Sequence, residues 1–273
     1  MIGVDAEGFF VGSDGLAVPA LVVFDKVRKD MVEYRKDDLG YLSLRYDAPQ
    51  VSLIEDGLAW EICPKPEDDP IKLVENIQLG IEISRQIAAT TGYDVHIGPF
   101  VNFDPVHVNR PEIRILGCSP DRSIYGGGLR RPRQDPRRTF WRTGGAHIHF
   151  SIPGITEDME MVFKLVTTCD STLGVLDVVL DHSDLAKKRR EMYGQPGKYR
   201  LQKWGVEYRT PSNSWLNQPL GFLEMAKQVH DFVGRGRALF IKDAPQAISM
   251  CDADLARVIL YQAQQELNRE YAL

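Results

Sequence analysis

Two histidines lie two residues apart in the stretch Gly144–Ser151, which reads Gly-Gly-Ala-His-Ile-His-Phe-Ser. In an extended strand, side chains alternate between faces, so His147 and His149 project from the same face. The paired glycines before them let the backbone enter the strand closely or at positive φ. A pair of this kind can bind a metal or a phosphate, and it can equally be the polar face of a half-exposed strand.

Acidic residues occur in similar settings elsewhere in the chain. Asp5 and Glu7 stand two apart in a predicted strand over residues 1–11, so both carboxylates share one face. Glu61 is embedded in an apolar strand, where an unpaired buried charge is costly and needs a partner. Glu207 and Arg209 share one face of a strand over residues 205–209. For any one of these residues, a solvated strand face is the alternative.

Arginines concentrate in an irregular stretch, residues 122–142, that also contains three consecutive glycines. The seven are Arg122, Arg130, Arg131, Arg133, Arg137, Arg138 and Arg142. Loops of this length are usually functional or disordered, and guanidinium groups suit phosphate and carboxylate oxygens. The stretch therefore indicates either a basic flap over an anionic substrate or a solvated loop, and we count Arg142 among the candidate catalytic residues.

A second basic cluster, Lys187-Lys188-Arg189-Arg190, leads into a glycine-rich loop over residues 193–200 that ends in Arg200. The usual role of such a cluster is a solvated helix end. Arginines for anions and carboxylates for metals are both needed in nucleotide chemistry, so we keep both arginine sets as candidates.

Composition and charge limit the class of protein. The chain has 273 residues, is 43% hydrophobic and 26% charged, and carries a net charge of −5, which argues against a general nucleic-acid binder. The four cysteines show no CxxC spacing, which indicates reduced thiols in a cytoplasmic setting. No apolar run is long enough for a membrane span, and the first residues lack the features of a signal peptide. We therefore expect a cytoplasmic protein.

The pattern of hydrophobic residues predicts a mixture of strands and helices. A β-hairpin is expected over residues 41–63, with its turn at Asp56-Gly57, and a long helix over 70–91 ended by Thr91-Gly92. Further helices are expected over 156–190, with an interruption at 167–173, and over 220–235 and 252–270. Further strands are expected over 16–23, 95–103 and 113–118.

The order of these motifs resembles the glutamine synthetase superfamily, and within it the phage-type COOH-NH2 ligases (carboxylate–amine ligase, type 2). Three strings carry the resemblance: Gly117-Cys118-Ser119-Pro120-Asp121, Gly145-Ala146-His147-Ile148-His149, and the stretch from Gly205 to Trp215. The resemblance covers residues 2–216. It implies an α+β fold in which an antiparallel, curved β-sheet forms a funnel and helices pack on its outer face. Residues 1–273 would be a single catalytic domain, with the sheet core in 1–216 and a helical closing segment in 217–273.

The resemblance also implies an activity. Members of this superfamily use ATP and Mg²⁺ (or Mn²⁺) to join a carboxylate to an amine through an acyl phosphate. The substrates would be small-molecule or peptide carboxylates and amines, and a modified nucleobase fits the same chemistry. Superfamily relatives often place their sites near subunit contacts, which is compatible with a homo-oligomer. A phage-encoded protein would act in the cytoplasm of the host.

The resemblance assigns roles residue by residue. The implied metal ligands are Asp5, Glu7, Glu61, His147 and Glu207. His149, Arg189, Arg190 and Lys203 would contact the nucleotide, and Arg209, Arg200 and Arg142 would act on the transferring phosphoryl group.

This chain departs from the superfamily pattern in three places. Asp5 stands where many relatives have Glu. An arginine expected two residues before Glu207 is replaced by Gly205, so Lys203 or Arg200 would have to substitute. A second hairpin carboxylate is either Asp56 or Glu55.

Two other functions remain open at this point. Guanidino kinases share the sheet architecture, transfer phosphate to nitrogen and stop there. A catalytically inactive relative could serve as a binding or assembly protein.

Overall fold

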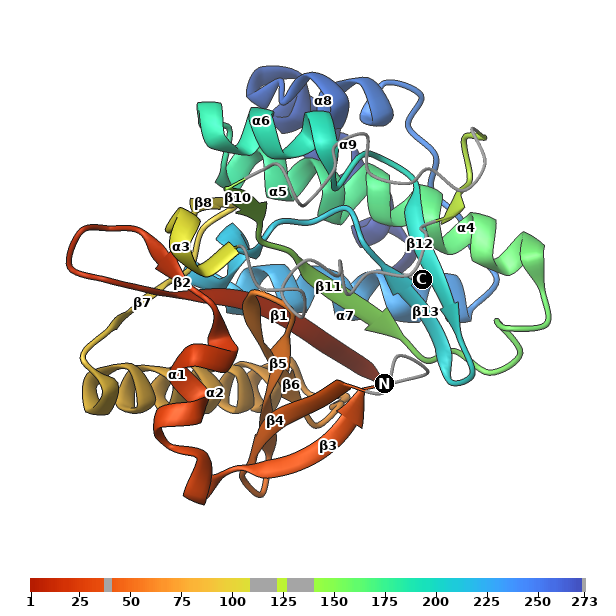
Figure 1. The fold of residues 1–273 in the computed structure, drawn as a ribbon. Helices are drawn as coiled ribbons and strands as arrows, with labels where there is room; N and C mark the ends of the chain where they lie inside the picture. The colour runs from red at the N-terminus through yellow and green to blue at the C-terminus, as the bar shows by residue number, and fades with distance from the viewer. Residues whose placement is uncertain (37–40, 109–121, 127–139, 272–273) are drawn as a thin grey trace.

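One large antiparallel β-sheet organises the molecule (Figure 1). The computed structural model describes residues 1–36, 41–108, 122–126 and 140–271. Within them the sheet has eleven strands, nine of which follow the order β3-β4-β5-β6-β1-β11-β13-β12-β9. These nine are β1 (Ile2–Val11), β3 (Val32–Lys36), β4 (Tyr41–Asp47), β5 (Val51–Asp56), β6 (Ala59–Pro64), β9 (Arg122–Ser123), β11 (Ala146–Phe150), β12 (Lys198–Gln202) and β13 (Gly205–Tyr208).

Strand β1 lies at the centre of this sheet. It pairs with β6 on one side and β11 on the other, and its second half also pairs with β2 (Ala17–Val18) and β7 (Asp94–His96). Its alternation explains this position: Ile2 and Val4 point into the hydrophobic core, whereas Asp5 and Glu7 occupy the opposite face. The sequence predicted both the strand and the shared face of the two carboxylates.

Helices cover the apolar face of the sheet. Helix α2 (Pro70–Thr91) packs on β5 and β6, α7 (Pro219–Gly234) on β1, and α4 (Met159–Cys169) on β13. The contact with α2 is close, because a Cβ added at Gly80 would lie 2.5 Å from a side-chain carbon of Ile62. The α+β class expected from the sequence, with a large antiparallel sheet, is confirmed.

Local signals explain the predicted helix and hairpin. The side chain of Asp69 accepts a hydrogen bond from the Ile71 amide at the start of α2, and Gly92 adopts the left-handed conformation at its end. Gly57 has φ of 62° in the turn between β5 and β6, as the Asp-Gly dipeptide indicates. Both elements were predicted.

Other elements match the expectation only in part. In the segment 156–190, a π-helical stretch (Asp170–Gly174) lies at the expected interruption, between α4 and α5 (Val175–Leu180), and a further break precedes α6 (Asp184–Met192). Around the π-helical stretch, the hydroxyls of Thr167, Thr168, Ser171 and Thr172 each donate to the carbonyl four residues earlier. The expected strand over 16–23 is only the short β2, and α1 (Ala20–Lys26) begins directly after Pro19. The expected strand over 95–103 divides into β7 and β8 (Phe100–Asn102) at Gly98-Pro99.

The remaining elements complete the molecule. They are 3₁₀ turns at Arg28–Asp30 and Asn213–Asn217, α3 (Pro105–Val108), β10 (Trp141–Thr143, which pairs with β8), α8 (Ala244–Met250) and α9 (Ala253–Tyr271). Helices α5, α6, α8 and α9 gather on the side of the molecule away from α2 (Figure 1). Helix α8 was not predicted. Among the described residues, every helix is too short or too polar to span a bilayer.

Two expectations fall outside the described residues. They are the strand over 113–118, with the string Gly117–Asp121, and most of the arginine-rich stretch 122–142.

Candidate functional site

The candidate residues meet on the polar face of the sheet because of its register. Across β6, β1 and β11, Glu61 lies opposite Glu7, and Asp5 lies opposite His147. Across β11, β13 and β12, His149 lies opposite Glu207, and Glu207 lies opposite Arg200. Directly opposed residues share a face, so five neighbouring strands present one continuous row of charged side chains.

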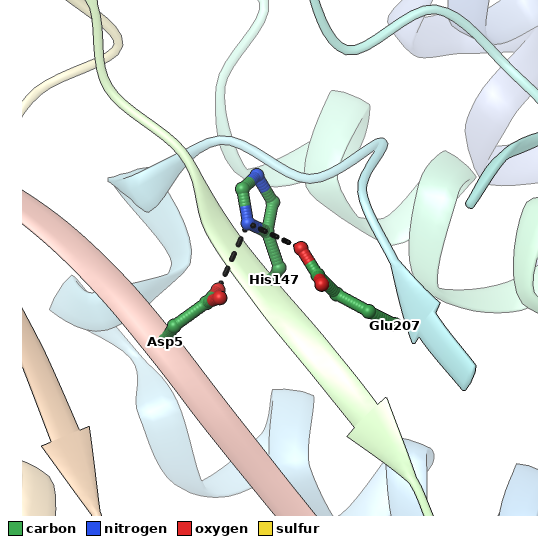
Figure 2. A group of neighbouring side chains, drawn as sticks. All are labelled: Asp5, His147 and Glu207. Atoms are coloured by element: carbon green, nitrogen blue, oxygen red, sulfur yellow. Dashed lines mark ion pairs between the residues drawn. The ribbon is translucent and has the colours of Figure 1, made fainter. Parts of the chain in front are cut away.

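Asp5, His147 and Glu207 form the first cluster, which Figure 2 shows between strands β1, β11 and β13. The Nδ1 atom of His147 lies 2.8 Å from an Asp5 oxygen and 3.3 Å from a Glu207 oxygen. Each of the three side chains is at most about one-tenth exposed. One ligand atom from each residue lies within 4.8 Å of the others, which is a spacing that one metal ion can bridge.

Glu7, Asp56 and Glu61 form the second cluster, with the same 4.8 Å spacing of one oxygen from each. Glu7 also accepts a hydrogen bond of 2.7 Å from the Gly145 amide, and Glu61 accepts one of 3.1 Å from the Cys63 thiol. Of the two hairpin carboxylates that the sequence left open, Asp56 is the one that lies beside Glu7 and Glu61. Glu55 is buried and accepts from the Leu44 amide.

The two clusters have opposite electrostatic character. Burial, with the charges of Asp56 and Asp5 adding to it, raises the pKa of Glu7 to about 7. Burial and the same two neighbours raise the pKa of Glu61 well above its usual range. In the first cluster, burial opposes ionisation, but His147 and His149 hold the Asp5 pKa well below its usual range. Glu7 and Glu61 thus retain protons at pH values where an exposed carboxylate is ionised.

The charges of the first cluster compensate one another. Burial disfavours a charged ring, but Asp5 and Glu207 raise the pKa of His147 to about 9. Burial and Asp5 act to raise the Glu207 pKa, whereas the hydrogen bond from His147 and the charge of Arg209 lower it to about 2. This cluster is therefore ionised at neutral pH.

Two predicted arginines contact Glu207. Arg200 Nε donates to one carboxylate oxygen at 2.6 Å, and Arg209 Nη1 donates to the other oxygen. The side chain of Arg200 is 27% exposed, whereas that of Arg209 is buried. Arg200 is consequently the more accessible of the two to an anionic ligand.

Arg189 and Arg190 are buried at the end of α6, where their hydrogen bonds favour a structural role over nucleotide contact. The three guanidinium nitrogens of Arg189 donate to the backbone carbonyls of Gly144, Thr210 and Pro211, one each, at 2.8–3.0 Å. Arg190 pairs with Asp177 at 2.6 Å. The bonds of Arg189 join α6 to residues just before β11 and just after β13, and the Arg190 pair joins α6 to α5.

The other predicted contacts are placed more peripherally. His149 lies 3.2 Å from Asp5 and packs against Trp204, with ring centroids 4.7 Å apart and the ring planes tilted by 37°. Lys203 is exposed in the turn between β12 and β13. Arg142 is in β10 of the small sheet, donates to the Trp141 carbonyl, and has a pKa lowered to about 10 by burial.

Gly205 explains one departure from the superfamily pattern. A Cβ at this position would lie 2.1 Å from the Phe150 carbonyl oxygen of β11. No arginine can be accommodated there without moving the strand.

Sequence reasoning missed Tyr193, which follows α6 and lies at the first cluster. Its hydroxyl is 3.3 Å from His147 Nε2 and accepts a hydrogen bond from Arg209 Nη2. The one feature of the sequence that could have indicated it is its position as the first residue of the glycine-rich loop 193–200.

The donor chemistry of both clusters fits divalent cations. The second cluster offers only oxygen ligands, as Mg²⁺ prefers. In the first, His147 directs Nδ1 toward two carboxylates while Nε2 faces a hydroxyl, which is the arrangement of a metal-binding histidine with an outer partner. Coordination by Glu207 would require its bonds to the arginines to rearrange.

Comparison with known proteins supports the resemblance. None of the curated proteins matches this chain. Among solved structures, one described as "Apo GmaS without ligand" aligns with 100% of this chain and 69% of its own, at 12% sequence identity and a TM-score of 0.41. Residues 136–245 match the model of the phage phiEco32-like COOH.NH2 ligase-type 2 family, which confirms the resemblance found in the sequence. The matched stretch contains His147, His149, Glu207, Arg189, Arg190, Arg200 and Arg209.

Proposed function

We propose that this protein is an ATP- and divalent-metal-dependent carboxylate–amine ligase. The observation that carries the proposal is the row of side chains on one sheet face. Two clusters suited to cations lie beside arginines suited to phosphate oxygens, and the second half of the row falls within the family match. A ligase of this kind needs both groups of side chains at one place.

The metal ligands in this proposal are Asp5, His147 and Glu207 for one ion, and Glu7, Asp56 and Glu61 for another. Bound Mg²⁺ or Mn²⁺ would neutralise the negative charge on the transferring phosphoryl group. Asp56 joins the ligands named from the sequence because of its position beside Glu7 and Glu61.

The protein's own cations would complete the charge balance. Arg200 and Arg209 already contact a carboxylate, and their fork geometry suits phosphate oxygens equally well. His149 stands between Asp5 and the exposed edge at Trp204, where a nucleotide phosphate would enter. Arg142 and Lys203 remain outer candidates, and Arg189 and Arg190 support the loop instead.

The proposed reaction has two balanced steps. A substrate carboxylate oxygen attacks the γ-phosphorus of ATP, the bond to the β-phosphate oxygen breaks, and ADP leaves. The amine nitrogen then attacks the carbonyl of the acyl phosphate, the C–O bond breaks, and phosphate leaves as the nitrogen loses a proton. Positioning and charge neutralisation supply most of the catalysis in such a transfer.

An assay with ATP, Mg²⁺ and a panel of carboxylates and amines tests the proposal. We expect ADP, phosphate and an amide in equal amounts. Glu7→Gln and Glu207→Gln should each lower the rate at least about 100-fold, because each removes charge that a bound cation needs. Glu224→Gln, on the exposed surface of α7, should leave the rate unchanged.

Other outcomes would favour the rival functions. ADP together with a phosphorylated acceptor, and no amide, would indicate a phosphotransferase. A protein that binds partners but turns over no ATP would be an inactive relative. Full activity in both glutamine variants would refute the site assignment.

A further inference from the structure

The hydroxyl group of Tyr193 lies between His147, a candidate metal ligand, and Arg209, a candidate phosphate contact. Its oxygen accepts a hydrogen bond from Arg209 Nη2, since a guanidinium can only donate. The same oxygen lies 3.3 Å from Nε2 of His147. One side of this hydroxyl therefore faces a candidate metal ligand, and the other faces a candidate phosphate contact.

The backbone around Tyr193 is fixed by close packing. The Tyr193 amide donates to the Arg189 carbonyl at 2.7 Å, while the Arg189 side chain is bonded to three other carbonyls. A Cβ at Gly194 would lie 2.0 Å from an Arg189 nitrogen and 2.7 Å from the Thr210 carbonyl oxygen. The Tyr193 ring also lies beneath both guanidinium groups, 5.4 Å from Arg189 and 5.6 Å from Arg209. The hydroxyl is thus held in place by the same network that buries Arg189.

We propose that Tyr193 is a positioning residue that orients His147 for metal binding and anchors the Arg209 guanidinium. When Nδ1 of His147 coordinates a cation, the ring hydrogen resides on Nε2, and the Tyr193 oxygen is its acceptor. Loss of such an outer partner typically weakens metal binding 10- to 100-fold. The inference rests on the proposed metal role of His147.

The test is the affinity of the full chain for Mn²⁺ alone, measured by calorimetry without ATP or substrates. Tyr193→Phe removes only the hydroxyl. It should weaken Mn²⁺ binding at the first cluster, which contains His147, 10- to 100-fold. Tyr93→Phe is the matched control, because its hydroxyl also accepts from a cation, Lys26 Nζ at 3.1 Å, and its ring also lies under that cation. This control should bind Mn²⁺ as the wild type does.

A double-mutant cycle shows whether Tyr193 acts through His147. In a His147→Ala background, Tyr193→Phe should have no further effect on Mn²⁺ affinity. An equal loss in both backgrounds, or an unchanged affinity in the single variant, would overturn the inference.

A measurement on the wild type avoids dependence on the folding of a variant. Long-range ¹H–¹⁵N spectra of the Mg²⁺-loaded protein should place the His147 ring hydrogen on Nε2, and a hydrogen on Nδ1 would overturn the inference. A wild type that binds no Mn²⁺ overturns both the metal centre and this role for Tyr193. A wild type that shows the expected binding pattern but makes no amide refutes the proposed activity and leaves the role of Tyr193 intact.

Discussion

Individual side chains in the site carry a charge imbalance that a cation would relieve. Glu7 and Glu61 lie among other carboxylates, and their raised pKa values mean that they retain protons at pH values where exposed carboxylates are ionised. A cation and these protons compete for the same oxygens. Metal binding at the second cluster should therefore release protons.

The affinity of the second cluster for metal should rise with pH in the range around the Glu7 pKa of about 7. A group with this pKa is about one-tenth ionised at pH 6 and about nine-tenths at pH 8, so Mg²⁺ affinity should increase roughly tenfold. Calorimetric titrations at the two pH values measure this, and Glu7→Gln should reduce the increase. An affinity independent of pH would contradict the raised pKa.

The metal-free protein should show the opposite trend in stability. Because the Glu7 pKa is higher in the folded protein than in the unfolded chain, its contribution is full below about pH 4.5 and is lost as the pH rises through about 7. The melting temperature should fall between pH 5 and pH 8 in a chelator. The fall should be smaller in Glu7→Gln, and an equal fall in that variant would assign the effect to other groups.

Alternation along strands made much of the site predictable at the residue scale. It placed Asp5 with Glu7, His147 with His149, and Glu207 with Arg209 on shared faces. The burial of Arg189 was not predictable, because its acceptors come from Gly144 and residues 210–211, far along the chain. Tyr193 was missed for the same reason: one partner, His147, is on β11, and the other, Arg209, directly follows β13.

At the scale of elements, α6 joins the sheet through the buried side chain of Arg189. Arg189→Met should lower the free energy of unfolding by at least about 3 kcal/mol, since it leaves three carbonyls without their charged donor. Urea denaturation measures this, with Lys187→Met on the exposed side of α6 as the control. A stable Arg189→Met protein with a selective loss of ATP binding would instead support a nucleotide contact.

The pairing of β13 with β11 requires a residue without a Cβ at position 205, which is Gly205. Gly205→Ala should destabilise the protein by about 1–3 kcal/mol, because the added Cβ meets the Phe150 carbonyl. Gly221→Ala, where a Cβ would meet nothing within 4 Å, should be neutral or stabilising. Equal urea midpoints for the two variants would argue against the close approach of the strands.

Elements with strong local signals were predictable, and those shaped by tertiary packing were not. The Asp69 cap and Gly92 define α2, and Asp56-Gly57 defines the hairpin. An interruption over 167–173 was expected, but its π-helical form at Asp170–Gly174 was not. This stretch has a tertiary anchor, since Asp170 accepts hydrogen bonds from Tyr208 and from the Gly197 amide. No local pattern indicates those partners.

At the scale of the whole molecule, one hydrophobic core includes residues from both ends of the chain. Ile2 and Val4 of β1 belong to the same cluster as Phe222, Val229 and Leu267 of the C-terminal helices. We therefore propose that residues 1–273 form one catalytic domain, in which the segment 217–273 is an integral part. Calorimetry should show a single unfolding transition, whereas two separate transitions would indicate two domains.

Both clusters on the sheet face are proposed to hold divalent cations. A crystal structure of the protein soaked in Mn²⁺ tests this proposal most directly, by anomalous scattering from the metal. We predict one peak among Asp5, His147 and Glu207, and a second among Glu7, Asp56 and Glu61. Well-ordered crystals with no anomalous peak at either cluster would contradict the assignment of these residues as metal ligands.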